Sequence, residues 1–173
     1  MINKIYITGS VGSGKSTLAK QLSKEFGFVH CELDNVIYEL DAESKTGNRK
    51  RSPADRDALI NEVLSNERWI VEDTVRADYE YIWQMSDSII LLEPPVYVIK
   101  RRVICRWVKQ NLGLEKSGYK PGFYMLKYMF KWIKDYENGT TGPKSRINNY
   151  SHKLSVLKTD ADIKSYKKDR LVK

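Results

Sequence analysis

The sequence has little of what would cross-link a small protein or hold a structural metal. Its 173 residues include two cysteines, Cys31 and Cys105, and two histidines, His30 and His152. Their number and spacing give neither a disulfide framework nor a zinc-binding pattern, so we expect no structural metal site. A chain of this length can bury about 70% of its unfolded surface without such cross-links. We therefore expect a single domain over residues 1–173, held together by its hydrophobic core.

Long hydrophobic runs are also missing. The longest apolar run near the middle of the chain, Ile89–Leu92, has four residues, whereas a membrane-spanning helix needs about 20. Residues 1–8 lack the long apolar stretch and the small-residue cleavage site of a secretory signal. These absences argue against a membrane protein and favour a reducing cytoplasm as the location.

Acidic side chains are scarce in one stretch of the chain. Residues 96–134 contain 10 basic residues and one acidic residue, whereas residues 1–95 contain 11 basic and 16 acidic ones. The net charge of +8 therefore comes largely from one stretch. Such a concentration predicts an anionic partner, either the phosphates of a small molecule or a nucleic acid backbone. A lysine-rich helix surface in water is the alternative interpretation.

What the chain does contain is a regular alternation of apolar strands and helices. Short apolar segments predict strands at residues 4–8, 28–33, 69–71, 88–92 and 154–157. Amphipathic spacing and capping residues predict helices at residues 15–26, 53–66, 97–112 and 122–137, and from about residue 160. The alternation predicts a three-layer α/β fold, with a five-stranded parallel sheet covered by helices on both faces. Two long segments between strands, residues 35–68 and about 95–153, are expected to carry function.

One motif carries specific chemistry. Residues 9–16, Gly-Ser-Val-Gly-Ser-Gly-Lys-Ser, match the phosphate-binding pattern G-x-x-x-x-G-K-[ST] between a predicted strand and a predicted helix. In this pattern the glycines bring backbone N–H groups against phosphate oxygens. Lys15 would reach the β- and γ-phosphates, and the hydroxyl of Ser16 would bind Mg²⁺. The motif predicts that ATP and Mg²⁺ are bound by Gly9, Ser10, Gly12, Ser13, Gly14, Lys15, Ser16 and Thr17.

The rest of the chain narrows the class of nucleotide-binding protein. The sequence has no Asn-Lys-x-Asp motif for guanine recognition, which argues against a GTPase, and a large motor ATPase needs a longer chain. A compact kinase of the phosphate-loop (P-loop) class remains. In such a kinase, residues 35–68 would bind the acceptor and residues 95–153 would form a basic helical lid.

The sequence resembles the DNA topology modulation proteins, an adenylate kinase-related family of P-loop kinases. The resemblance rests on residues 9–16, Leu33-Asp34, Trp69–Glu72, Ser88–Pro94 and Phe130–Ile133. It implies a five-stranded parallel sheet, ATP binding, and phosphoryl transfer to a small acceptor, which could be a nucleoside, a nucleotide or a hydroxyl metabolite. The family's name refers to an effect on DNA topology, which does not by itself establish contact with DNA.

Asp34 is the first candidate for the acceptor site. It follows the second predicted strand, at the edge where ligands of open parallel sheets bind. In shikimate- and gluconate-type kinases, which the chain resembles in architecture, an aspartate at this place meets the acceptor hydroxyl. A carboxylate there can orient the hydroxyl and accept its proton. The alternative is that Asp34 caps a helix starting near Asn35. Glu32 is expected to make a surface or secondary contact.

Glu72 follows the third predicted strand, where the acidic residue of P-loop kinases holds Mg²⁺, usually through water. Residues 72–76, Glu-Asp-Thr-Val-Arg, also line up with the Asp-Gly-Phe-Pro-Arg stretch of adenylate kinases, which implies that Arg76 binds the acceptor. Asp73 stands where those kinases have glycine, and its carboxylate would repel a monophosphate acceptor. A surface salt bridge is the alternative role for Arg76.

Arg102 and Arg106 lie four residues apart on a predicted helix and therefore share one face. The resembled family carries arginines in this helix. Arginine can donate two parallel hydrogen bonds to a transferring phosphoryl group, which lysine cannot do. The expected catalytic residues are therefore Lys15, Asp34, Arg102 and Arg106. Arg146 and the loop at residues 159–161 are weaker candidates for contact with the nucleotide.

Aromatic and basic residues alternate between Tyr119 and Tyr136, a mixture typical of surfaces that stack and bind single-stranded nucleic acid. However, Lys127, Lys131 and Lys134 share one helix face and most aromatic residues fall on others, so an amphipathic helix packed on the domain explains the pattern.

The favoured function is thus an ATP-dependent kinase with a small-molecule acceptor. The alternative is a nucleotide-binding protein that binds nucleic acid through residues 96–134 and affects DNA topology. The acceptor and the oligomeric state stay open.

Overall fold

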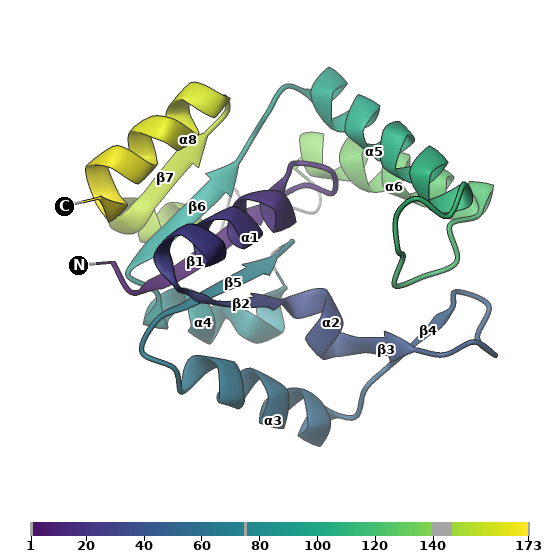
Figure 1. The fold of residues 1–173 in the computed structure, drawn as a ribbon, viewed down its shortest axis with the longest axis horizontal. Helices are drawn as coiled ribbons and strands as arrows, with labels where there is room; N and C mark the ends of the chain where they lie inside the picture. The colour runs from purple at the N-terminus through teal and green to yellow at the C-terminus, as the bar shows by residue number, and fades with distance from the viewer. Residues whose placement is uncertain (1, 75, 140–146, 173) are drawn as a thin grey trace.

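The structure, a computed structural model, describes residues 2–74, 76–139 and 147–172. Figure 1 shows a central sheet between two layers of helices. Its five parallel strands pair in the order β2-β5-β1-β6-β7. In chain order these strands are β1 Lys4–Gly9, β2 Val29–Glu32, β5 Trp69–Asp73, β6 Ser88–Leu92 and β7 Leu154–Leu157. This arrangement confirms the predicted three-layer α/β fold.

Both faces of the sheet are covered because its central strands are apolar nearly throughout. One face packs against α1 (Lys15–Phe26) and α8 (Asp160–Tyr166), which bury Leu22 and Tyr166. The opposite face packs against α2 (Leu33–Ile37), α3 (Pro53–Leu64) and α4 (Glu80–Met85). On that face the ring of Trp83 is fully buried and lies 5.7 Å from the ring of Tyr6.

Two further units lie near the carboxyl end of the sheet (Figure 1). The basic segment forms α5 (Val96–Asn111) and α6 (Phe123–Glu137), which pack together through four buried residues, Ile99, Val103, Met129 and Ile133. The segment between β2 and β5 contains an antiparallel hairpin of β3 (Tyr38–Leu40) and β4 (Asn48–Lys50). Short helical turns are η1 Ala77–Tyr79, η2 Asn148–Lys153 and η3 Lys167–Leu171.

Two features of the structure were not predicted from the sequence, the β3–β4 hairpin and the full length of β5. Both are stabilised by polar contacts. The β3–β4 hairpin has no apolar alternation; Glu39 holds it by accepting hydrogen bonds from Arg49 at 2.7 Å and Arg51 at 2.5 Å. Strand β5 continues two residues beyond the predicted apolar segment, through Glu72 and Asp73. Both carboxylates are nevertheless buried, and both are hydrogen-bonded, Glu72 to Ser16 and Asp73 to Tyr6.

The hairpin contacts the loop between α5 and α6. The backbone N–H of Lys120 donates to the carbonyl of Thr46 at 2.7 Å, and its ammonium donates to the carbonyl of Ser44 at 2.7 Å. The side-chain amide of Asn48 donates to the carbonyl of Gly118 at 3.1 Å. The two long segments therefore meet each other.

Within the described parts of the chain, no helix has the length and apolar character needed to cross a membrane. Cys31 is buried, Cys105 is exposed, and both are free thiols.

Candidate active site

The candidate site lies at the carboxyl ends of β1, β2 and β5, and strand geometry divides its residues between two faces. Successive side chains of a strand point to opposite faces, while partners in parallel register point to the same one. Glu72 pairs in register with Glu32 of β2, and Asp73 pairs with Thr8 of β1. Glu72 and Asp73 are therefore neighbours in sequence that serve opposite faces of the sheet.

The phosphate loop has the backbone that its sequence predicts. Gly12 and Gly14 have φ angles of 76° and 105°, which side-chain-bearing residues rarely adopt. Space is also limited: a Cβ at Gly12 would lie 2.7 Å from Cγ2 of Val103, and one at Gly9 would lie 2.5 Å from the carbonyl oxygen of Leu92. Gly14 is the N-cap of α1, so the start of this helix opens into the loop, as phosphate binding requires.

Lys15 folds back over the loop. Its ammonium donates hydrogen bonds to the carbonyl of Gly9 at 3.0 Å and to that of Ser10 at 2.9 Å. Burial lowers the pKa of this ammonium, and the nearby charge of Glu72 opposes the shift. An anion beside Lys15 would favour its charged form.

Ser13 and Thr17, two further polar side chains of the predicted nucleotide site, differ in their surroundings. The hydroxyl of Ser13 is buried and has no hydrogen-bond partner among the residues that the structure describes. Thr17 is exposed in the first turn of α1.

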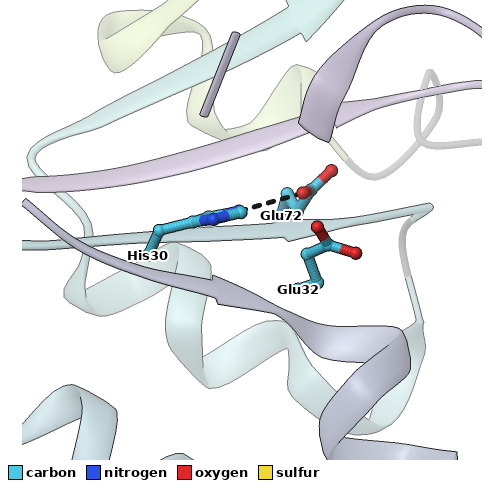
Figure 2. A group of neighbouring side chains, drawn as sticks. All are labelled: His30, Glu32 and Glu72. Carbon is cyan, nitrogen blue, oxygen red and sulfur yellow. Dashed lines mark hydrogen bonds and ion pairs between the residues drawn. The ribbon is translucent and has the colours of Figure 1, made fainter. Parts of the chain in front are cut away.

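On the α1 face, three side chains converge on Glu72. The hydroxyl of Ser16 donates to Oε2 of Glu72 at 2.8 Å, and Nε2 of His30 lies 3.0 Å from Oε1. Figure 2 shows His30 and Glu32, both on β2, turned toward Glu72 on β5. Glu32 is also paired with the ammonium of Lys20 at 2.7 Å. The structure thus brings together Ser16 and Glu72, the two residues predicted to hold the metal.

Sequence reasoning missed His30 and expected only a surface or secondary contact from Glu32. The signal that could have found both is the two-residue period of a strand. Residues 30 and 32 of one strand must share a face, and the acidic end of the neighbouring strand must lie beside them. Spacing rules for zinc sites, applied to the sequence, do not detect ligands from adjacent strands.

On the opposite face, Arg76 lies between two carboxylates. Its guanidinium binds Asp73, and it also donates to Oδ1 of Asp34 at 2.5 Å. The backbone N–H of Arg76 donates to Asp73 at 2.7 Å, and the hydroxyl of Tyr6 donates to the same carboxylate at 3.2 Å. Burial alone would lower the pKa of Arg76, but the charges of Asp73 and Asp34 outweigh burial and raise it. The guanidinium therefore stays charged.

Asp34 does not take the place of a helix cap. Helix α2 begins at Leu33, so Glu32 occupies the N-cap position and Asp34 lies within the first turn. The side chain of Asp34 is 67% exposed, with Arg76 holding one of its oxygens. The alternative reading of Asp34 as the cap of a helix starting near Asn35 is therefore wrong, because the helix starts earlier.

The two arginines predicted to form a lid lie on α5, and among the described residues Arg102 hydrogen-bonds the phosphate loop. Nη1 of Arg102 donates to the carbonyl of Ser13 at 2.8 Å. Nε of Arg106 lies 3.4 Å from a carboxylate oxygen of Glu115, and the charge of Arg106 is among the weaker influences that lower the pKa of Lys15. Arg146 lies outside the described residues.

The loop at residues 159–161 has a structural use. Thr159 and Asp162 form a reciprocal capping box at the start of α8. Contact of residues 159–161 with the nucleotide stays a prediction.

Helix α6 leaves more aromatic surface exposed than its sequence pattern suggests. Lys127, Lys131 and Lys134 are exposed as expected. However, Tyr124, Tyr128 and Trp132 are also exposed, by 64%, 37% and 47%. Their rings form a row, with centroids 4.5 Å and then 6.2 Å apart. The prediction that packing on the domain explains the aromatics is wrong for these three, because the helix buries a different stripe, Met129, Ile133 and Tyr136.

Comparisons with known proteins agree with this fold. No protein-family model matches the chain. The uncharacterized protein YqaC of Bacillus subtilis (strain 168) is 28% identical over 146 residues, which is 84% of this chain and 79% of YqaC. A shikimate kinase of Actinobacillus pleuropneumoniae is 35% identical over 72 residues, which is 36% of this chain and 39% of that enzyme.

Among solved structures, the shikimate kinase from Acinetobacter baumannii in complex with shikimate aligns with 97% of this chain and 90% of its own, at 14% identity and a TM-score of 0.55. At this identity the likeness concerns the fold. The chain therefore has the fold of the small-molecule P-loop kinases.

Proposed function

We propose that the chain is an ATP-dependent kinase of the P-loop class, which transfers the γ-phosphoryl group of ATP to a hydroxyl group of a small acceptor. The observation that carries the proposal is the placement of carboxylates on both faces of the sheet, at the end where the phosphate loop lies. Glu72 binds Ser16 on the α1 face, while Asp34 is held at the opposite face. Nucleotide binding alone needs only the first group. The 72-residue similarity to shikimate kinases supports the same class of reaction.

The phosphate loop and its neighbours fit ATP and Mg²⁺. Gly12 and Gly14 hold the positive φ angles that let backbone N–H groups of such a loop point at phosphate oxygens. Ser16 and Glu72 offer a hydroxyl and a carboxylate within one hydrogen bond of each other, and Mg²⁺ prefers such oxygen ligands. Mg²⁺, when bound, would neutralise charge on the β- and γ-phosphates. Lys15 would exchange its two carbonyl partners for phosphate oxygens.

Asp34 is the residue proposed to meet the acceptor. One of its oxygens is fixed by Arg76, and its side chain is largely exposed. In the transfer, the acceptor oxygen attacks the γ-phosphorus, and the bond from that phosphorus to the β–γ bridging oxygen breaks. The hydroxyl proton passes to the carboxylate of Asp34, which later releases it to water.

The charges around Arg76 favour an acceptor without a phosphate group. A free arginine at this place would attract the monophosphate of a nucleotide acceptor. In the structure, however, Arg76 is shared between Asp73 and Asp34, so the three side chains together carry one negative charge. A neutral polyol or nucleoside would meet less repulsion there than a nucleoside monophosphate. We therefore propose a neutral hydroxyl compound as the acceptor.

Arg102 and Arg106 complete the proposed site from α5. Arg102 already contacts the phosphate loop through the carbonyl of Ser13, and it would exchange this partner for a phosphate oxygen. Arg106 would exchange Glu115 for the transferring group. Both guanidinium groups would then stabilise the charge that develops on the phosphoryl oxygens.

The direct test is ADP formation by the full chain with ATP, Mg²⁺ and a panel of acceptors. The panel should contain polyols, nucleosides, hydroxy acids and nucleoside monophosphates. We expect one class of neutral hydroxyl compounds to raise ADP formation well above the rate without acceptor, with a phosphorylated product detected by mass spectrometry. Stimulation by nucleoside monophosphates alone would contradict the proposed acceptor class. ATP binding with no stimulation by any acceptor would contradict the kinase itself.

One observation favours the second candidate function, binding of single-stranded nucleic acid. The exposed row Tyr124, Tyr128 and Trp132 lies on the helix that also exposes Lys127 and Lys131, and stacking on aromatic rings beside basic groups is how such strands are bound. The sequence resembles the DNA topology modulation proteins, and this second proposal includes that the chain is one of them.

Filter binding of an oligonucleotide across a salt series tests the second candidate. Contact with several phosphates requires a steep fall of affinity with salt. A shallow dependence, or no binding, would leave the kinase as the function supported by the structure.

A further inference from the structure

His30 gives the α1 face a ligand type that Mg²⁺ does not require. The structure places Nε2 of His30 and the carboxylate oxygens of Glu32 and Glu72 within 4.8 Å of one another. Figure 2 shows that the three side chains come from two neighbouring strands and turn into one space. The side chain of His30 is 13% exposed and that of Glu72 is 4% exposed, so the donors are held in place by the packed sheet.

Strand geometry explains why these residues meet. His30 and Glu32 are two positions apart on β2 and share the face that carries α1. Cys31, between them, points to the opposite face and packs in the apolar core there. Glu32 lies in register with Glu72, which directs both carboxylates to the same place. The cluster is therefore built by the sheet and does not depend on a loop.

The donor set suits a first-row transition metal better than Mg²⁺. Ligands bound at about 2.1 Å to one ion lie roughly 3–4 Å apart, so the separations here need only small side-chain adjustments. Imidazole nitrogen is a ligand for zinc, nickel and iron, while carboxylates extend the range to manganese. Mg²⁺ keeps oxygen ligands and most of its waters, and gains little from an imidazole.

We propose that His30, Glu32 and Glu72 bind a divalent first-row transition ion, of the Mn²⁺, Co²⁺ or Zn²⁺ type, in the absence of nucleotide. The site lies beside Ser16, so an ion held there is next to the phosphate loop before ATP arrives. The inference rests on the proposed function for its role, since it names the metal of the same site, but metal binding itself requires neither ATP nor an acceptor.

Lys20 provides an internal competitor for this site. Its ammonium lies 2.7 Å from Oε1 of Glu32 and its side chain is 64% exposed. A cation bound by Glu32 competes with that ammonium for the charge of the carboxylate. Removing the charge of Lys20 should therefore strengthen metal binding, whereas removing a ligand should weaken it. These opposite signs separate a metal site from a general loss of structure.

The test is a titration of the nucleotide-free full chain with Co²⁺, followed by its visible absorption. We expect one saturable Co²⁺ per chain that a large excess of Mg²⁺ does not displace. His30→Gln keeps an N–H that can bind Glu72 but loses the imidazole ligand. It should weaken Co²⁺ binding by at least the roughly 10–100-fold that loss of even an outer partner costs. Glu32→Gln should weaken Co²⁺ binding similarly.

Two variants serve as controls in the same titration. Lys20→Gln should tighten Co²⁺ binding about two- to fivefold, as expected for loss of an exposed ion pair. His152→Gln removes the other histidine of the chain, which is exposed on η2, and should leave Co²⁺ binding unchanged. Thermal melting checks that each variant is folded.

The inference is overturned if the wild-type chain binds no Co²⁺ saturably, if His30→Gln binds Co²⁺ as the wild type does, or if a large excess of Mg²⁺ displaces Co²⁺. In these cases His30 only orients Glu72 through a hydrogen bond. Failure of the proposed function is distinguishable: a chain that binds Co²⁺ through His30 but phosphorylates no acceptor loses the kinase assignment and keeps the metal site.

Discussion

Glu72 and Asp73 are adjacent acidic residues with nearly equal burial, at 4% and 3% exposure, yet they contact entirely different groups. Glu72 faces α1 and binds Ser16 and His30. Asp73 faces the other side of the sheet and binds Arg76 and Tyr6. The difference comes from strand alternation alone. Consecutive residues of β5 therefore belong to different sites. Glu72 lies on the face proposed to bind nucleotide and metal, and Asp73 lies on the face proposed to bind the acceptor.

The largest effect is expected at Lys15, whose ammonium is influenced by the charge of Glu72 on one side and by those of Asp34 and Asp73 on the other. Lys15→Ala removes a charge that matches the transition state better than the ground state. We expect turnover to fall by about 10³-fold or more, to the rate measured without acceptor, as judged by ADP formation in a folded variant. Lys24→Ala, on an exposed position of the same helix, is the matched control. Turnover within a few-fold of wild type would remove the kinase assignment.

The acceptor side is tested next by Asp34→Asn. This change keeps the size of the side chain but removes the group proposed to accept the hydroxyl proton. We expect turnover to fall about 10²–10⁴-fold, measured with the acceptor identified from the panel. Asp57→Asn, on an exposed position of α3, should have no effect. If Asp34→Asn turns over normally, Asp34 serves only to hold Arg76.

A smaller effect is expected from Arg76→Lys. Lysine keeps the charge but cannot hold Asp73 and Asp34 with one planar group. We expect the KM for the acceptor to rise about tenfold while the KM for ATP stays within about twofold, a split that steady-state kinetics resolves. Arg49→Lys, at an exposed arginine of the β3–β4 hairpin, is the control. An equal rise of both KM values would mean that the two sides are not separate.

The smallest effects concern α5 and α6, the basic helices, which pack against each other and do not carry Glu72 or Asp34. Arg102→Lys and Arg106→Lys should each lower turnover several-fold and weaken ATP binding less, because charge survives and the planar group is lost. Neutralising Lys127, Lys131 and Lys134 together should leave turnover nearly unchanged. If nucleic acid is the partner instead, the triple variant should flatten the salt dependence of oligonucleotide binding by about three phosphate contacts.

The fold and the phosphate loop were predictable from sequence because their signals are local. Strands β1 and β6 were predicted from their own apolar segments. The phosphate loop was predicted from the motif at residues 9–16. The helix at Lys15–Phe26 begins and ends at the predicted residues. Ser16 and Glu72 were both assigned to the metal because the motif starts a helix after one strand and Glu72 ends another, and parallel strands bring their carboxyl ends together.

The remaining features could not be predicted because they depend on contacts between distant segments. The hairpin at Tyr38–Leu40 and Asn48–Lys50 is held by ion pairs, which leave no periodic pattern in the sequence. The exposure of Tyr128 and Trp132 depends on which side of α6 meets α5. His30 joins Glu72 only because β2 and β5 are neighbours in the sheet.

The separation of the two sides is tested most directly by the affinity for MgATP without acceptor, measured by calorimetry for Glu72→Gln and Asp34→Asn. Neither measurement requires the acceptor to be known. We predict that Glu72→Gln binds MgATP at least about tenfold more weakly than the wild type, while Asp34→Asn binds it within about twofold. An equal loss in both variants, or an unchanged affinity in Glu72→Gln, would contradict the division of the site between the two faces of the sheet.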